Sequence, residues 1–358
     1  MKLIIKILSL LIVFTVVLIL AVGSWGYFTL QATLSQPLRI ELVDTLEVPT
    51  GSTPARVFSR LESEGVIERA GWVRRYWQWQ MPDAVLQVGE YRIEPGMDVH
   101  ALLDLLQRGE VIQRSVTLVE GWNFSQFRSA LARAERLQQT LPEEWSNDQV
   151  AAELELSVDH PEGMFFPDTY VYTLGMTDRD ILNQAHQRMQ QEMTEAWEQR
   201  AEGLPISTPY EALILASIIE KETGVPHERG EIAGVFARRL KIGMRLQTDP
   251  TVIYGMGENY QGRIRRSDLR RPTPYNTYTI DGLPPTPIAM PGREALRAAV
   301  NPEPGKTLYF VARGDGSHVF SETLRQHNRA VRNYQINRAS NYRSSPPPAE
   351  STADGVTE

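Results

Sequence analysis

A long uncharged apolar run near the start of the chain is the clearest feature of its hydrophobic pattern. The run covers Ile7 to Phe28 and follows Lys2 and Lys6. About 20 apolar residues cross the core of a bilayer as a helix. Lysines that precede such a run favour a cytoplasmic amino terminus. The pattern therefore predicts one membrane-spanning helix over 7–28, with the rest of the chain outside the cytoplasm.

This reading divides the start of the chain into a cytoplasmic segment 1–6, the spanning helix 7–28 and a linker 29–38. The alternative is a cleaved signal peptide, because Ala21-Val22-Gly23 matches a small-x-small cleavage site. The apolar run is longer than the roughly 7–15 residues of a signal-peptide core. That length favours a retained single-pass anchor in the inner (cytoplasmic) membrane, with the larger part of the chain periplasmic.

Three later segments repeat one pattern, in which an apolar lead and a glycine precede apolar residues six and ten positions further on. Each segment has a small polar residue where a helix cap would stand. The pattern predicts a strand, a glycine turn and a short amphipathic helix, although such units are common and chance can produce three matches. The segments are VPTGSTPARVFSRL with Gly51, IEPGMDVHALLDLL with Gly96 and LVEGWNFSQFRSAL with Gly121.

The first two repeats, with a helical stretch over Ala70 to Gln80 between them, predict a small βααβ subdomain over 39–114. In its order of elements this subdomain is similar to LysM modules, which hold glycans that contain N-acetylglucosamine. Trp72, Tyr76 and Trp79 share one face of the expected helix. Such a stripe is more often part of a core than a platform for sugar rings.

From Ser115 onward, helical periods alternate with short strand-like pieces. Leu308 to Ser321 predicts a hairpin that turns at Gly314-Asp315-Gly316. Helices mixed with antiparallel strands indicate the α+β class, with a larger mixed α+β domain over 115–342. The proline- and serine-rich tail, 343–358, has too few large apolar residues to order itself. Helices are expected over Phe124–Leu137, Asp178–Arg200, Pro209–Thr223, Arg229–Lys241, Pro291–Val300 and Thr323–Arg338.

Composition excludes several classes of function. The length of 358 residues fits two or more domains at roughly 150 residues each. A net charge of −7 gives no broad basic surface, so nucleic acid is not an expected partner. The absence of cysteine excludes disulfides, zinc–thiolate sites and a cysteine nucleophile. The histidines never stand four residues apart, and phosphate-loop, dinucleotide and serine-hydrolase motifs are missing. We therefore predict neither a metal nor a cofactor.

A glutamate in an otherwise apolar helix is the first candidate for chemistry. The helix begins with a capping box, Thr208-Pro209-Tyr210-Glu211. At 100° per residue, Glu220 falls on the apolar side of this helix. Burial and the negative end of the helix dipole would both raise the pKa of Glu220, as a general acid for glycosidic cleavage requires. The alternatives are a buried ion pair with a lysine or arginine and simple emergence of the side chain at the end of the helix. The helix alone slightly favours such a structural role over catalysis.

Two later segments carry polar groups suited to sugar hydroxyls. RLKIGMRLQTDPTVIYG places Gln247 and Asp249 at an expected helix start, with Asp249 as N-cap and Pro250 as first helical residue. Plain capping is the alternative role for this turn. TPYNTYTIDGLPPTPIAMPG is a long proline- and glycine-rich segment with Asn276 and Tyr278. Segments of this length without regular structure are usually functional.

Five motifs stand in a fixed order along the chain: EGMFFPDTY, LASIIEKET, RLKIGMRLQTDPTVIYG, YNTYTIDGLPPTPIAMPG and LYFVARGDGSHVFSETLRQHN. Together they resemble the MltG (YceG-like) family of endolytic murein transglycosylases. The resemblance implies a lyase that cleaves the MurNAc–GlcNAc bond of nascent peptidoglycan strands without water. The products would have 1,6-anhydroMurNAc ends, and strand elongation would stop. Glu220 would act as acid and then as base, without a cofactor, beside penicillin-binding synthases.

Contacts to the glycan are expected from Gln247, Asp249, Asn276 and Tyr278. Two other functions stay open. One is a hydrolytic muramidase, whose products would carry reducing ends. The other is a non-catalytic peptidoglycan-binding scaffold, in which the LysM-like subdomain would hold the glycan.

Overall fold

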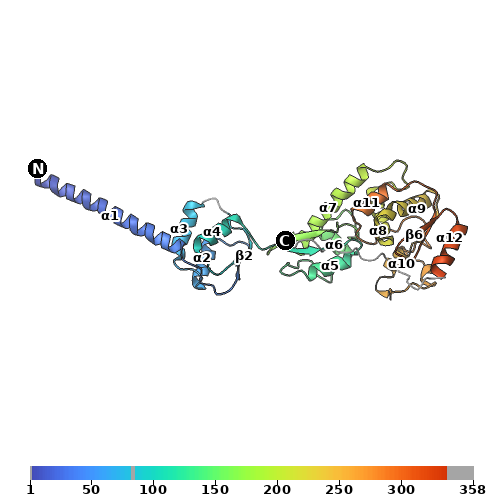
Figure 1. The fold of residues 1–358 in the computed structure, drawn as a ribbon, viewed down its shortest axis with the longest axis horizontal. Helices are drawn as coiled ribbons and strands as arrows, with labels where there is room; N and C mark the ends of the chain where they lie inside the picture. Colours follow the sequence, from blue (N-terminus) through green and yellow to red (C-terminus); the bar gives the residue numbers. More distant parts are fainter. Residues whose placement is uncertain (1, 82–84, 337–358) are drawn as a thin grey trace, which may run out of the picture. The chain divides into compact units, whose positions relative to one another are not determined.

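The computed structural model describes residues 2–81 and 85–336, and the chain divides into two compact units (Figure 1). The predicted disordered tail, 343–358, lies outside the described residues. Unit 1 comprises Met1–Arg114, Glu135–Gln138 and Val171–Met176, and unit 2 comprises Ser115–Ala134, Gln139–Tyr170 and Thr177–Glu358.

Unit 1 begins with one long helix, α1 (Lys2–Leu34). Its length and apolar composition are sufficient to cross a membrane, as those of a signal sequence are too. The last turn of α1 packs into unit 1, where Leu34 is buried. Trp25 meets Trp72 edge-on, with ring centroids 6.1 Å apart. Because these contacts hold the end of the helix, α1 continues through most of the segment expected to be a polar linker.

The rest of unit 1 has the predicted β–α–α–β order, with one more helix after it. β1 (Asp44–Val48) pairs antiparallel with β2 (Gly89–Ile93). α2 (Pro54–Ser63) and α3 (Ala70–Gln80) lie between these strands in the chain, and α4 (Val99–Arg108) follows them. The apolar faces of these elements form one continuous core.

The aromatic face of α3 differs from the prediction. Trp77 is buried and meets Phe58 edge-on at a centroid distance of 5.8 Å. Trp79 is 75% exposed, while Trp72 and Tyr76 are half-buried. The buried residues of α3 are Ala70, Val73 and Trp77, which share a face at steps of three and four. Both faces have helical spacing, and packing against α2 and the rest of the core covers the Trp77 face.

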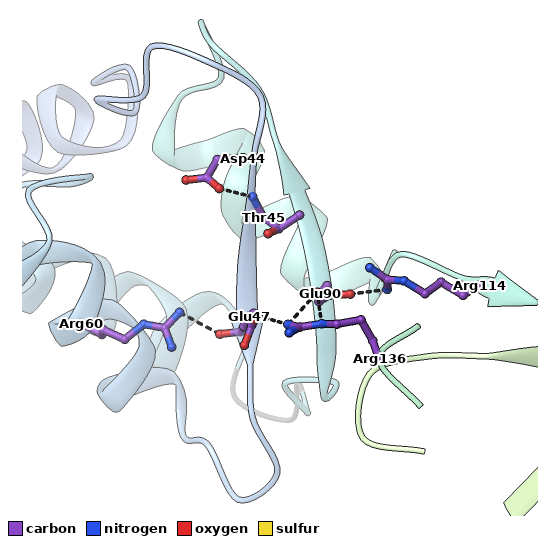
Figure 2. Close-up of polar contacts among 7 residues, drawn as sticks. All are labelled: Asp44, Thr45, Glu47, Arg60, Glu90, Arg114 and Arg136. Carbon is purple, nitrogen blue, oxygen red and sulfur yellow. Dashed lines mark hydrogen bonds and ion pairs between the residues drawn. The ribbon is translucent and has the colours of Figure 1, made fainter. Parts of the chain in front are cut away.

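A buried glutamate in unit 1 collects arginines from separate parts of the chain (Figure 2). Glu90 on β2 pairs with Arg114 and with Arg136, whose Nη2 lies 2.9 Å from Glu90 Oε1. Arg136 also pairs with Glu47. The backbone φ of Arg136 is 63°, in the left-handed region. The helix predicted to reach Leu137 ends at Ala132, before Arg136 and its ion pairs.

Unit 2 is built around α8 (Pro209–Glu222), in which every residue from Ala212 to Ile219 is buried. This helix packs against its neighbours in Figure 1: α7 (Asp178–Glu198), α9 (Arg229–Lys241), α10 (Asp249–Met256) and α11 (Arg293–Val300). A chain segment buried all round, as predicted, can hold a polar side chain away from water.

The remaining elements frame this core. β5 (Tyr309–Ala312) and β6 (His318–Ser321) form the predicted antiparallel hairpin, and α12 (Leu324–Val331) packs on both strands. β3 (Arg114–Thr117) pairs with β4 (Thr169–Tyr172), and two of the boundaries between the units fall within these strands, after Arg114 and after Tyr170. The other elements are α5 (Phe124–Ala132), α6 (Asn147–Glu153), the 3-10 turns Pro226–Glu228, Gly257–Asn259 and Asp268–Arg270, and the π turn Arg332–Ile336.

The three repeated segments fold as predicted. Their glycines have φ values of 76° at Gly51, 87° at Gly96 and 74° at Gly121, a region that glycine enters without steric cost. The helix that follows each glycine, α2, α4 or α5, is capped by a side chain that accepts a backbone N–H. The apolar residues that follow at six and ten positions are all buried: Val57, Leu61, Leu102, Leu106, Phe127 and Leu131.

Candidate active site

Glu220 lies in the last turn of α8, and the start of that helix forms as predicted. The Thr208 hydroxyl accepts the N–H of Glu211, and the Glu211 carboxylate accepts the N–H of Thr208. Pro209 occupies the first helical position, where its missing N–H has no cost. With the middle of the helix buried, the Glu220 side chain is only 7% exposed.

Two donors face the Glu220 carboxyl group. The backbone N–H of Gly292 donates to Oε2 at 3.1 Å. Nη2 of Arg229 lies 3.5 Å from Oε1, at the long limit of a hydrogen bond. The buried Nε of Arg229 has no hydrogen-bond partner among the described residues. The buried ion pair that the sequence left as an alternative is therefore present, but it is loose.

The environment of Glu220 acts on its pKa in both directions. Burial raises the pKa, in the direction predicted from the helix. The N–H of Gly292 and the charge of Arg229 lower it, because both stabilise the carboxylate, while the charge of Glu120 raises it. A carboxyl group whose pKa burial raises, and whose anion has two donors in place, can give up a proton and then take one back.

The loop before α11 holds the Gly292 N–H in place. The N–H of Ile288 donates to the hydroxyl of Ser217 on α8 at 3.0 Å. Two residues later, Met290 accepts from the N–H of Gly121 at 2.9 Å and donates to the carbonyl of Trp122 at 2.8 Å. These bonds fix the end of the long proline-rich segment against α8.

Gly292 itself allows a close approach. A Cβ at this position would lie 2.1 Å from a carboxylate oxygen of Glu120, nearer than any real contact. The Glu120 side chain is exposed, and the atoms in the way are its mobile end, so an alanine at this position would displace that carboxylate. Glycine therefore leaves room for a second negative charge near Glu220.

A tight turn places Arg229 at the start of α9. The Thr223 hydroxyl accepts the N–H of Val225 at 2.9 Å. The buried carboxylate of Glu228 accepts the N–H of His318 at 2.8 Å and lies 2.7 Å from its Nδ1. The β5–β6 hairpin therefore stabilises the turn before α9, and His318 has a structural role.

A cavity of about 600 Å³ adjoins Lys221, the residue after Glu220. We call it the tyrosine cavity, after Tyr254, Tyr260 and Tyr275 in its wall. Its other titratable groups include Glu162, which is 3% exposed. One Glu162 oxygen accepts the N–H of Phe124 and the other accepts the Tyr254 hydroxyl, both at 3.0 Å. Burial raises the pKa of Glu162 to about 7.

Gly121, the glycine of the third repeat, separates the tyrosine cavity from Glu220. It lines the cavity, and a Cβ on it would lie 3.8 Å from Cγ of Glu220. Its carbonyl accepts a hydrogen bond from Lys221 Nζ at 2.9 Å. The cavity and the buried carboxyl are thus one residue apart.

Three of the four predicted glycan contacts surround another cavity, of about 550 Å³, which Gln247, Asp249, Tyr278 and Glu222 line. The Tyr278 hydroxyl donates to Asp249 at 2.7 Å. Burial raises the pKa of Glu222 to about 7. Polar groups do gather here, and their contact with a glycan stays a prediction.

Asn276 does not fit its predicted role. It is 1% exposed, and its amide nitrogen donates to the carbonyls of Asp268, Leu269 and Arg271 while its oxygen accepts the N–H of Tyr278. Because both ends of the amide are paired inside the loop, Asn276 holds the loop together instead of facing a glycan.

The cap of α10 is also one residue away from its predicted place. Thr248 is the N-cap, and Asp249 and Pro250 are the first two helical residues. The Asp249 carboxylate therefore does not cap its own helix. It accepts a hydrogen bond from the Tyr278 hydroxyl instead.

The chain carrying this site matches a known family. The model of the YceG-like family matches residues 46–333. The chain belongs to the YceG-like family. Glu220, its donors and the tyrosine cavity lie inside the matched region.

Relatives of this YceG-like chain have names that state an activity. A Bacillus subtilis (strain 168) protein named endolytic murein transglycosylase is 30% identical over 331 residues, covering 86% of this chain and 90% of that protein. A Streptococcus pneumoniae (serotype 2) protein of the same name is 26% identical over 346 residues, covering 86% of this chain and 62% of that one. A solved structure of a yceG-like protein from Listeria monocytogenes is 27% identical, covers 81% of this chain and 99% of that chain, and has a TM-score of 0.49.

The sequence of this YceG-like chain pointed to Glu220 but not to its surroundings. Arg229 stands nine positions later, beyond a turn whose direction no local pattern gives. Gly292 contributes a backbone N–H, and because every residue except proline has this group, the sequence cannot single it out. Glu162 appears in the sequence only as the first residue of the motif EGMFFPDTY, and its partner Tyr254 is 92 positions away.

Proposed function

We propose that this chain is an endolytic lytic transglycosylase that cuts peptidoglycan glycan strands, with its chemistry in unit 2. The observation that carries the proposal is the buried Glu220 carboxyl, whose pKa burial raises while Gly292 and Arg229 face its oxygens. Membership of the YceG-like family and the names of the relatives support the same activity.

Glu220 acts first as an acid. Its carboxyl group gives a proton to the oxygen that joins C1 of MurNAc to GlcNAc, and the C1–O bond breaks. The leaving sugar departs with a hydroxyl group, and positive charge develops at C1 of the MurNAc ring. The new carboxylate is stabilised by the Gly292 N–H and by Arg229, which are already in position.

Glu220 acts next as a base. Its carboxylate takes the proton from the C6 hydroxyl of the same MurNAc, and O6 bonds to C1 to close the 1,6-anhydro ring. The attacking group belongs to the sugar that it attacks, so it gains from proximity and needs no carboxylate nucleophile. No water is consumed, and the carboxyl group returns to its protonated state. A cut inside a nascent strand ends its elongation.

Hydrolysis is the alternative, because Glu162 supplies unit 2 with a second buried carboxyl beside the tyrosine cavity. A hydrolase would add water at C1 and leave reducing ends. The test is to digest uncrosslinked glycan strands with the full chain in ¹⁸O-labelled water and to identify the new ends by mass spectrometry. We expect anhydro ends without ¹⁸O. Reducing MurNAc ends that carry ¹⁸O would establish hydrolysis instead.

The proposal also places the protein in the cell. The apolar helix α1 would span the inner membrane once, with residues 1–6 in the cytoplasm and unit 2 on the outer side, where peptidoglycan lies. Penicillin-binding synthases are the proposed partners there, since they make the strands to be cut. The β–α–α–β part of unit 1, within 39–114, would serve as a LysM-like subdomain that guides the strand.

Replacing Arg229 with methionine should move the alkaline limb of activity to higher pH. Glu220 must be protonated for the first step, so activity falls as the pH rises through its pKa. Arg229 lowers that pKa, and without this cation the acid stays protonated to higher pH. The maximal rate should fall about tenfold, because the carboxylate formed in the first step loses one long charge-assisted contact. The measurement is kcat/KM for strand cleavage as a function of pH.

Two further variants check the sign of this effect. Glu120→Gln removes a charge that raises the pKa of Glu220, so its alkaline limb should move to lower pH. Arg229→Lys keeps the cation and should leave the limb near its original place. Shifts of equal sign in Arg229→Met and Glu120→Gln would contradict the assignment of Glu220 as the titrating acid.

A further inference from the structure

Lys221 stands next to the candidate acid without a carboxylate partner. It follows Glu220 in the last turn of α8, its side chain is exposed, and it lines the tyrosine cavity. Its ammonium group donates to the carbonyl of Gly121 at 2.9 Å and forms no ion pair within the described part of the chain. An ammonium group has three donors, so two remain for a ligand.

The carboxyl group inside the cavity does not neutralise Lys221. Both oxygens of Glu162 already accept hydrogen bonds, from Phe124 and Tyr254. Burial raises the pKa of Glu162 to about 7, even though the charge of Lys221 lowers it. A large share of Glu162 is therefore uncharged at neutral pH. An incoming anion would meet the Lys221 cation and a carboxyl group that is only partly charged.

The other titratable groups of the wall add little charge. Nδ1 of His160 accepts the N–H of Glu162 at 3.2 Å, and burial lowers the pKa of this histidine. The ring is therefore neutral at neutral pH. Among the described residues that line the cavity, Lys221 is the cation.

The walls suit a sugar ring. Tyr254 and Tyr275 meet edge to face with centroids 4.9 Å apart, and the Tyr275 hydroxyl is tied to the Thr286 hydroxyl at 2.8 Å. Rigid aromatic surfaces of this kind pack against the C–H faces of sugars. The volume of about 600 Å³ lies within the range of roughly 300–1,000 Å³ typical of small-ligand sites.

We propose that the tyrosine cavity is a subsite for an acidic amino sugar, and that Lys221 binds the carboxylate on the substituent of that sugar. The inference rests on the proposed function, because it names the feature of the glycan that unit 2 recognises beside the bond to be cut. Two sources supply this chemistry. One is the lactyl carboxylate of a muramic acid that has lost its peptide, and the other is a carboxylate of the peptide stem.

The test measures binding to the full chain carrying Glu220→Gln, so that no probe is consumed. Three tetrasaccharides serve as probes: a GlcNAc–MurNAc repeat with peptide stems, the same repeat after an amidase has removed the stems, and neutral chitotetraose. Adding Lys221→Gln should weaken binding of an acidic probe about tenfold, as expected for one charge-assisted contact, and should leave chitotetraose binding unchanged. Lys221→Arg should restore binding of the acidic probe.

Lys241→Gln is the matched control, since it removes the same charge from an exposed lysine at the end of α9. If Lys221→Gln weakens binding of the stem-free tetrasaccharide alone, the ligand of Lys221 is the lactyl carboxylate. If it weakens binding of the stem-bearing tetrasaccharide alone, the ligand is a carboxylate of the peptide. Equal loss for all three probes, no loss, or no measurable binding of either acidic probe would overturn the proposal. The proposed function is judged separately, by whether the unmutated chain releases anhydro ends.

Discussion

Glu220→Gln should abolish cleavage of glycan strands while unit 2 stays folded. The amide has the size of the carboxyl group, and its oxygen can still accept the N–H of Gly292. It has no proton to give to the glycosidic oxygen and cannot take one from the C6 hydroxyl. Because one group serves both steps, we expect a loss of at least about 1,000-fold in rate. The measurement is the initial rate of anhydro-end formation, with circular dichroism to show that the fold persists.

Two other glutamates of unit 2 serve as comparisons that test whether Glu220 is the acid. Glu162 and Glu222 are also carboxyl groups whose pKa burial raises to about 7, and either would be a plausible acid by that criterion alone. Glu162→Gln and Glu222→Gln should each retain far more activity than Glu220→Gln. Glu258→Gln, at an exposed position, is the neutral reference. If Glu222→Gln were inactive and Glu220→Gln active, the acid would have to be reassigned.

Gly163→Ala should destabilise unit 2 by about 3 kcal/mol. Gly163 has a φ of 80°, and a Cβ there would lie 2.5 Å from the side chain of Pro287. The left-handed backbone costs an alanine about 1–2 kcal/mol, and overpacking adds about 1–3 kcal/mol. Pro287 precedes Ile288, whose N–H is bonded to Ser217. The strain would therefore reach the loop that holds Gly292, and activity should fall as well.

Gly203→Ala separates the two causes. Gly203 has a similar φ of 69°, but nothing lies within 4 Å of the position a Cβ would take. This variant should lose only the backbone part, about 1 kcal/mol. Amide hydrogen exchange in α8 is the suitable measurement, because it reports the opening of unit 2 without the contribution of unit 1. Equal changes for the two variants would show that contact with Pro287 is not what makes Gly163 necessary.

Local chemistry explains which elements the sequence predicts. The Thr208 capping box, the glycine turns and the hairpin at Gly314-Asp315-Gly316 each depend on residues close together in the chain. Glu220 was found in the same way, because helical periodicity alone places it on a buried face. The raised pKa then follows from that burial.

Long-range contacts explain the rest. Asn276 was a candidate glycan contact because it stands in a long proline- and glycine-rich segment, yet its amide is buried among carbonyls of its own loop. Trp77 and not Trp79 entered the core of unit 1, since only the packing partners of α3 decide which aromatic face is covered. The pairing of Arg136 with Glu90, beyond the early end of a predicted helix, joins residues 46 positions apart. None of these contacts can be predicted from the local pattern of hydrophobic and polar residues.

The third glycine turn shows how such a site can arise from ordinary parts. Nothing lies within 4 Å of the positions where a Cβ would stand on Gly51 and Gly96, while the same position on Gly121 is bordered by Glu220 and Lys221. The turn needs glycine for its own backbone in all three copies. In the third copy the same turn also lies against an acid and presents its carbonyl to a lysine. If the repeats descend from one duplicated unit, evolution needed no new backbone geometry here, only a new neighbour.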